Sequence, residues 1–278
     1  MHDIGALSAT PTETVLGIGV TILSKEDCVA QAMNWITNGS QAHSIVCANP
    51  HSLYVASEDS LFAEALLSAD VVVPDGVGVV IASRLFGGQI RKRITGSDIF
   101  AGINSAIAWT QCNRVFLLGS TDEVLGRIVA RLERLYPGLE VVGVYSPPFK
   151  DQFDVADVLD MVERVNRAGP DVLWVGMTAP KQEKWIKEAK AYLDVPVVGA
   201  VGAVFDFVAG TKPRPGAISR TLGLEWLGRL RSDPRHLWRR TLVSAPRFLA
   251  AVLRERLSNR IPLLKHLSDE SGSGQSHG

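Results

Sequence analysis

Short apolar runs alternate with longer amphipathic stretches between about residues 44 and 201. The apolar runs are rich in β-branched residues and lack polar alternation, which is typical of parallel strands buried on both faces. The pattern predicts six such strands: Ser44–Ala48, Val71–Val73, Arg114–Leu118, Glu140–Tyr145, Val172–Val175 and Val197–Val201. Between them it predicts helices, chiefly Leu61–Ser68, Val77–Leu85, Ile99–Trp109, Glu123–Leu135, Val155–Arg167 and Pro180–Leu193. This alternation predicts an α/β fold built on a doubly wound, mostly parallel, Rossmann-like sheet.

The pattern changes after Gly210, where Lys212–Gly216 reads as a turn-rich hinge and the following sequence is helical and rich in arginine. A helix is expected over Leu237–Leu257, with a break or kink at Pro246. The predicted organisation is a flexible leader over residues 1–14, an α/β core over 15–210, a basic helical C-terminal appendage over 211–267 and a disordered polar tail over 268–278.

The net charge of zero hides a strong asymmetry. Between Thr211 and Lys265 there are thirteen basic residues and three acidic ones, a net charge of +10. A basic segment on an acidic body, with Trp238 and Phe248 among its arginines, favours contact with phosphates, nucleic acid or the headgroups of an anionic membrane. The alternatives are a solvated helical face or a helix packed on its own core or on a neighbouring subunit, so a homo-oligomer stays open.

The chain also carries signals about its compartment. It has no signal segment at its N-terminus and no run of about 18 apolar residues that could span a bilayer, so a cytoplasmic protein is expected. Its three cysteines, Cys28, Cys47 and Cys112, are far apart and lack C-x-x-C spacing. We therefore expect reduced thiols rather than disulfides or a zinc site.

Candidate chemistry gathers where predicted strands end. Asn49, Asp75, Gln182 and Asp206 each come soon after an apolar strand, and parallel strands bring their carboxyl ends to one edge, where ligands bind. Asp75 could serve there as a catalytic base, with Gly76 and Gly78 leaving room for a substrate. The competing interpretation is that Asp75 is the N-cap of the helix over Val77–Leu85.

Arg93, in the segment Arg91–Asp98, adds positive charge suited to a diphosphate. Each candidate also has a structural interpretation: Gln182 as a first-turn helix residue, Asn49 as a turn before Pro50, Asp206 as a strand-end charge and Arg93 as a surface charge. Their occurrence together favours a site.

At these residues the chain resembles the WecG/TagA/CpsF family of bacterial glycosyltransferases, glycosyltransferase family 26. The resemblance runs from about Leu16 to Arg240 and is carried by five blocks in the family's order: Asp75–Gly78, Arg93–Asp98, Pro180–Glu183, Phe205–Asp206 and Leu222–Leu230. It implies an inverting transfer of a sugar from a UDP-sugar to a polyprenyl-diphosphate-linked saccharide in cell-surface polysaccharide synthesis. The implied sugars are N-acetylmannosamine, its uronic acid or glucose, and the implied location is the inner face of the plasma membrane, with peripheral attachment.

The resemblance also implies roles for residues. Asp75 matches the family's proposed catalytic base, and the residues implied to bind substrate are Asn49, Arg93, Gln182, Asp206, Arg229, Arg235 and Arg239. The three last arginines fall where the family's appendage closes over the nucleotide diphosphate. The chain departs from the family at Cys47, where members often have Thr, and this difference bears on the sugar that is accepted.

No D-x-D pair occurs in the chain, so we expect arginines rather than a metal ion to neutralise the leaving diphosphate, and no cofactor is expected. A Rossmann oxidoreductase is a weaker alternative, because Ile81 stands where the G-x-G-x-x-G fingerprint needs its last Gly. A binding protein that holds nucleic acid on its basic tail has thin support, since stacking aromatics are few. We expect no nucleic-acid partner.

Overall fold

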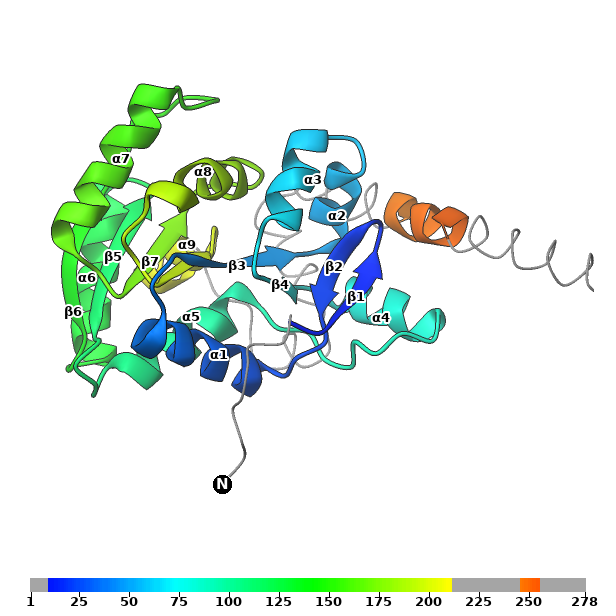
Figure 1. Ribbon diagram of the computed structural model, residues 1–278, viewed down its shortest axis with the longest axis horizontal. Coiled ribbons are helices and arrows are strands. Elements are labelled where there is room, and N and C mark those ends of the chain that lie inside the picture. The colour runs from blue at the N-terminus through cyan, green and yellow to red at the C-terminus, as the bar shows by residue number, and fades with distance from the viewer. Residues whose placement is uncertain (1–9, 212–245, 256–278) are drawn as a thin grey trace, which may run out of the picture.

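The computed structural model describes residues 10–211 and 246–255. Its centre is a six-stranded sheet in the order β4-β3-β8-β7-β5-β6, in which each neighbouring pair is parallel (Figure 1). The strands are β3 (His43–Ala48), β4 (Val71–Pro74), β5 (Arg114–Gly119), β6 (Glu140–Tyr145), β7 (Val172–Gly176) and β8 (Val197–Ala200). β1 (Thr12–Val15) and β2 (Ile18–Thr21) form a separate antiparallel hairpin. The predicted parallel sheet is thus confirmed.

Helices cover both faces of the sheet. One apolar core takes buried side chains from α2 (Pro50–Ala56), α3 (Ser60–Leu67), α4 (Val77–Leu85), α7 (Val155–Ala168) and α8 (Lys181–Ala189). The other takes them from α1 (Lys25–Asn38), α5 (Gly96–Ile107), α6 (Asp122–Leu135) and α9 (Val204–Ala209). A 3₁₀ turn, η1 (Lys190–Tyr192), follows α8. Along β4, Val72 joins the first core while Val71 and Val73 join the second, as expected for a doubly wound sheet.

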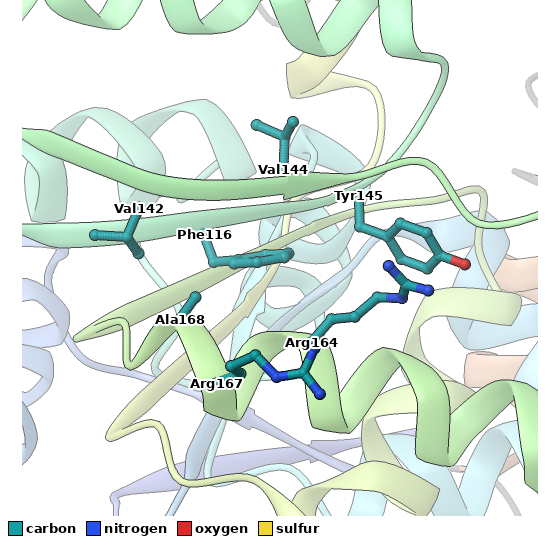
Figure 2. A pocket seen from close by; sticks show the side chains of 7 residues that line it. All are labelled: Phe116, Val142, Val144, Tyr145, Arg164, Arg167 and Ala168. Atoms are coloured by element: carbon teal, nitrogen blue, oxygen red, sulfur yellow. The ribbon is translucent and has the colours of Figure 1, made fainter.

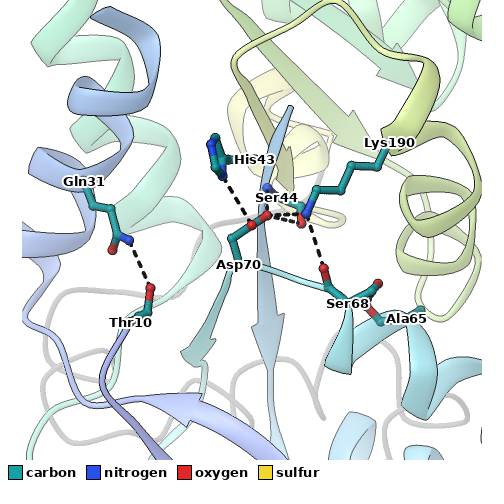
Figure 3. Close-up of polar contacts among 8 residues, drawn as sticks. All are labelled: Thr10, Gln31, His43, Ser44, Ala65, Ser68, Asp70 and Lys190. Carbon is teal, nitrogen blue, oxygen red and sulfur yellow. Dashed lines mark hydrogen bonds and ion pairs between the residues drawn. The ribbon is translucent and has the colours of Figure 1, made fainter. Parts of the chain in front are cut away.

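Asp70, just before β4, holds three elements together at the amino end of the sheet (Figure 3). Its Oδ2 accepts hydrogen bonds from Ser44 N at 2.7 Å and from Lys190 Nζ at 2.5 Å, and its Oδ1 lies 3.3 Å from His43 Nδ1. Burial raises the pKa of Asp70, but the Lys190 ammonium and the Ser44 N–H outweigh it and hold that pKa below its ordinary value. These bonds tie together the starts of β3 and β4 and the end of α8. Asn49, Asp75 and Gln182 lie at the opposite ends of these three elements.

The β1–β2 hairpin begins at Thr12, inside the segment predicted as a flexible leader. Tertiary contacts hold it: Val15 is buried, and the Glu13 carboxylate accepts hydrogen bonds from Ser83 Oγ at 2.9 Å and from Gln89 N at 2.6 Å. These partners lie far away in the sequence, which explains why local pattern did not predict the hairpin.

Residues 246–255 are helical and pack on the body of the protein beside the hairpin (Figure 1). Phe248 and Val252 are almost fully buried in the first apolar core. The Glu255 carboxylate accepts hydrogen bonds from Leu16 N at 3.1 Å and Gly17 N at 3.2 Å, in the hairpin turn. This part of the predicted appendage is therefore joined to the fold, while the predicted hinge over Lys212–Gly216 lies outside the described residues.

In the two described ranges, 10–211 and 246–255, no helix has both the length and the apolar character that a membrane span requires.

Candidate active site

Four of the predicted site residues lie at the carboxyl edge of the sheet. Asn49 follows β3, Asp75 follows β4, Gln182 lies in the first turn of α8 after β7, and Asp206 lies on α9 after β8. The four strands are consecutive neighbours in the order β4-β3-β8-β7. Moreover, β3 continues into a helix on one face and β8 into a helix on the other. Such a switch point is where open α/β sheets bind ligands.

Asp75 does not cap the helix that follows it. The N-cap position of α4 belongs to Gly76, with φ of 118° and no side-chain cap hydrogen bond. The Asp75 backbone N–H donates to Ala48 O at 2.8 Å, which fixes the end of β4 against β3. The carboxylate of Asp75 is half-buried and sits at the binding edge. The structural interpretation of Asp75 as an N-cap is thereby excluded.

The two glycines after Asp75 have different structural roles. A Cβ added to Gly78 would lie 2.6 Å from Pro50 Cγ, so Gly78 lets the start of α2 pack closely on the start of α4. At Gly76 a Cβ would make only an ordinary contact, 3.4 Å from Pro50 Cδ, and glycine is favoured there by the positive φ of 118°. The space on the Cβ side of Gly78, predicted from the sequence to be room for a substrate, is thus filled by Pro50.

Asn49 is the N-cap of α2. Its Oδ1 accepts hydrogen bonds from His51 N and Ser52 N, both at 3.0 Å, and Ser52 Oγ accepts one from Asn49 N at 2.7 Å. The Asn49 oxygen is therefore occupied in capping a helix, where the structural interpretation had expected a turn. A ligand contact from this side chain would be a donation from Nδ2.

Gln182 and Glu183 form a buried pair in the first turn of α8, with 5% and 2% of their surface exposed. Gln182 Nε2 donates a hydrogen bond to Glu183 Oε1 at 2.8 Å. Glu183 is not among the predicted site residues, because a Glu in the first turn of a helix is ordinary near the positive end of the helix. The structure shows that the Glu183 side chain is almost fully buried at the carboxyl edge, and the sequence alone does not indicate this burial.

Arg93 and Asp206 are placed near the same edge. Ile94 N donates to Pro74 O at 2.9 Å, which holds the segment containing Arg93 beside the end of β4. Asp206 lies in the first turn of α9, which follows β8, and Thr211 Oγ1 donates to its Oδ1 at 3.4 Å. The remaining predicted site residues, Arg229, Arg235 and Arg239, lie outside the described residues.

Cys47, on β3, faces the acidic part of this site. Its thiol lies 3.7 Å from Ala200 O as a hydrogen-bond donor. Burial raises the pKa of Cys47 well above its ordinary value, and the carboxylates of Asp75, Glu183 and Asp98 raise it further. The thiol is therefore neutral, a weak donor where the family often has a hydroxyl.

We expect Cys47 to resist alkylation by iodoacetamide near neutral pH, because the thiolate is the reactive form and this environment disfavours it. Cys28, whose pKa burial raises to about 12, should resist as well. Peptide mass spectrometry after timed labelling measures both. Labelling of Cys47 as fast as a free cysteine peptide would show that the thiol is not held neutral.

No three His, Cys, Asp or Glu side chains within residues 10–211 and 246–255 gather so that they could hold a metal ion. His43 instead stacks on Trp35, with ring centroids 4.4 Å apart.

A hollow of about 260 Å³ lies elsewhere, between the edge strand β6 and α7 (Figure 2). Arg164 covers the Tyr145 ring at 4.4 Å, and its Nε donates to Asp160 Oδ2 at 2.9 Å. Arg167 is paired with Glu163. Since both arginines are occupied and no carboxylate lines this hollow, it does not offer the chemistry of the carboxyl edge.

Comparison with known proteins shows the family to which the chain belongs. A family model described as the glycosyl transferase WecG/TagA/CpsF family matches residues 13–262. An N-acetylglucosaminyldiphosphoundecaprenol N-acetyl-beta-D-mannosaminyltransferase of Bacillus spizizenii is 33% identical over 82% of this chain and 85% of its own length. Proteins of the same name from Bacillus subtilis and Staphylococcus aureus strain MW2 are each 31% identical, over 78% and 76% of this chain and 81% and 80% of their own lengths. Because the match covers residues 13–262, a range that contains all five predicted blocks, the chain belongs to the WecG/TagA/CpsF family of glycosyltransferases.

Proposed function

We propose that this enzyme transfers an N-acetylmannosaminyl group from a UDP-sugar to N-acetylglucosamine linked to undecaprenyl diphosphate. The observation that carries the proposal is the half-buried Asp75 carboxylate at the sheet edge, in a chain whose relatives carry that activity in their names. Membership of a glycosyltransferase family leaves no support for the oxidoreductase or the nucleic-acid-binding alternative.

Asp75 is the proposed general base. The acceptor hydroxyl oxygen bonds to the anomeric carbon of the donor sugar while the bond from that carbon to the UDP oxygen breaks, and UDP leaves with the electron pair. The hydroxyl proton passes to the Asp75 carboxylate. Attack from the face opposite UDP inverts the anomeric centre.

The leaving diphosphate needs positive charge at the moment its bond breaks. Arg93 beside the end of β4, and Arg229, Arg235 and Arg239 in the basic segment, are the proposed source. Guanidinium groups bind phosphate oxygens in bidentate fashion and keep their charge at any working pH. Preorganised charge of this kind lowers the barrier without a metal ion.

The test of the proposed function is a UDP-release assay with a panel of UDP-sugars and short-chain polyprenyl-diphosphate acceptors. We expect release to depend on the N-acetylglucosamine-bearing acceptor and to be fastest with UDP-N-acetylmannosamine. Faster acceptor-dependent release with another sugar would assign a different donor, and no acceptor-dependent release with any pair would refute the proposal.

Transfer is expected to continue at its full rate in excess EDTA, because arginines rather than a metal ion are proposed to neutralise the diphosphate. The measurement is initial UDP release with and without the chelator. If activity is lost and returns specifically with magnesium or manganese, a metal ion carries the diphosphate instead.

Peripheral attachment to an anionic membrane is the proposed way the enzyme reaches its lipid-linked acceptor. The basic segment carries the charge, and Leu249 and Leu253 are partly exposed on the helix at residues 246–255, about 100° round the helix from the buried Phe248 and Val252. Each basic residue near an anionic surface can add roughly 1 kcal/mol. Flotation with vesicles of phosphatidylglycerol, against vesicles of neutral lipid, tests the attachment.

A further inference from the structure

The Gln182–Glu183 pair has a polar atom that the fold does not use. Gln182 Oε1 is buried and has no hydrogen-bond partner among the described residues. Buried polar atoms of native proteins are nearly always hydrogen-bonded, and an exception calls for an explanation. Because Gln182 lies in the first turn of α8, at the edge that carries Asp75, a bound substrate is the natural source of the missing donor.

Glu183 decides which end of the Gln182 amide faces that substrate. A carboxylate only accepts hydrogen bonds, so the amide must turn its NH₂ toward Glu183, as the 2.8 Å contact from Nε2 to Oε1 records. The carbonyl oxygen then points the other way. Gln182 Oε1 is therefore the atom that can accept a hydrogen bond from a ligand.

The turn after β8 supports the amide on its other side. Gly202 has φ of +51°, and a Cβ added there would lie 3.5 Å from both Nε2 and Oε1 of Gln182 and 3.4 Å from Met177 O. The amide thus packs between the end of β7 and the start of α9, within the same group of strand ends as Asp75. Because that Cβ would be equally far from Nε2 and Oε1, the Gly202 turn limits the space around the amide, and the hydrogen bond to Glu183 sets its orientation.

We propose that Glu183 is a positioning residue that fixes the Gln182 amide so that its Oε1 accepts a hydrogen bond from the substituent at C2 of the transferred sugar. This rests on the proposed function and deepens it. Both an acetamido N–H and a hydroxyl O–H can donate to Oε1, whereas a C2 methylene cannot. The pair therefore selects donor sugars that carry a hydrogen-bond donor at C2.

The experiment compares two substrates across a set of variants. The substrates are UDP-N-acetylmannosamine and UDP-2-deoxyglucose, which lacks any donor at C2, each with the same short-chain acceptor. In the wild type we expect kcat/KM to be at least about tenfold higher for the acetamido sugar. E183Q should remove most of this preference by lowering kcat/KM for the acetamido sugar alone, because the amide at 182 can then turn round.

Two further variants separate positioning from packing. The exchange Gln182→Glu with Glu183→Gln keeps an NH₂ group facing a carboxylate and leaves an acceptor oxygen at 182, so it should restore part of the preference. In a Gln182→Leu background, E183Q should have no additional effect on the preference. E188Q, an exposed change of the same charge on the same helix, is the matched control, and thermal melting reports folding.

The proposal is overturned if E183Q lowers kcat/KM equally for both sugars, since that would be a merely structural effect, or if the exchange restores nothing. It is also overturned if the wild type transfers both sugars equally well. A wild type that releases no UDP with any sugar and acceptor would instead refute the proposed function itself, before any variant is measured.

Discussion

Asp75→Asn is expected to lower kcat by about 100-fold or more, as is usual when a general base is lost, and to leave the fold intact. The fold should survive because Gly76, not Asp75, occupies the N-cap position of α4, and because the backbone N–H of residue 75 still donates to Ala48 O. Steady-state UDP release measures the change in kcat, and thermal melting reports the fold.

Asp151→Asn, in an exposed loop, is the matched control for the loss of one negative charge and should keep its activity. Wild-type turnover by Asp75→Asn with the natural acceptor would remove Asp75 from the mechanism. A large fall in melting temperature together with the loss of activity would instead assign Asp75 a structural role.

Most of the central sheet could be predicted because its strands are continuous apolar runs. The helix over Val77–Leu85 was predicted with the bounds that the structure has. Helix α1 was not predicted, although its buried Cys28, Ala32, Trp35 and Ile36 follow helical spacing, because polar residues separate them and no apolar stretch stands out. Helix α2 was missed because Asn49-Pro50 reads as a turn, and the same residues cap a helix.

The position of the candidate site could be predicted for a geometric reason. Parallel strands share one carboxyl edge, so residues after separate strands meet there whatever the loops do. The contacts within the site could not be predicted. Gly78 beside Pro50 depends on how two helices pack, and a hydrogen bond between Gln182 and Glu183 is unexpected because adjacent residues of a helix do not normally face each other.

Replacing Arg229, Arg235 and Arg239 together by alanine is expected to lower transfer to a soluble short-chain acceptor by about 100-fold or more, because the charge that stabilises the departing diphosphate is lost. The melting temperature should change little, since the apolar anchors Phe248 and Val252 remain. UDP release from the soluble acceptor measures this effect apart from membrane binding.

A chain that ends at Gly210 is the informative comparison, because it should lose thermal stability and vesicle binding as well as transfer activity. It lacks the arginines, and it also lacks Phe248, Val252 and the Glu255 carboxylate that binds the hairpin turn. Removal of a buried Phe side chain alone costs about 3–5 kcal/mol, so the shortened chain should also melt at a lower temperature. Its binding to anionic vesicles should weaken with the loss of the +10 segment.

If the triple variant keeps full activity on the soluble acceptor while the shortened chain loses it, the arginines do not hold the diphosphate, and the segment acts through the packing of residues 246–255 on the body. If the shortened chain also binds vesicles normally, the proposed membrane role fails as well.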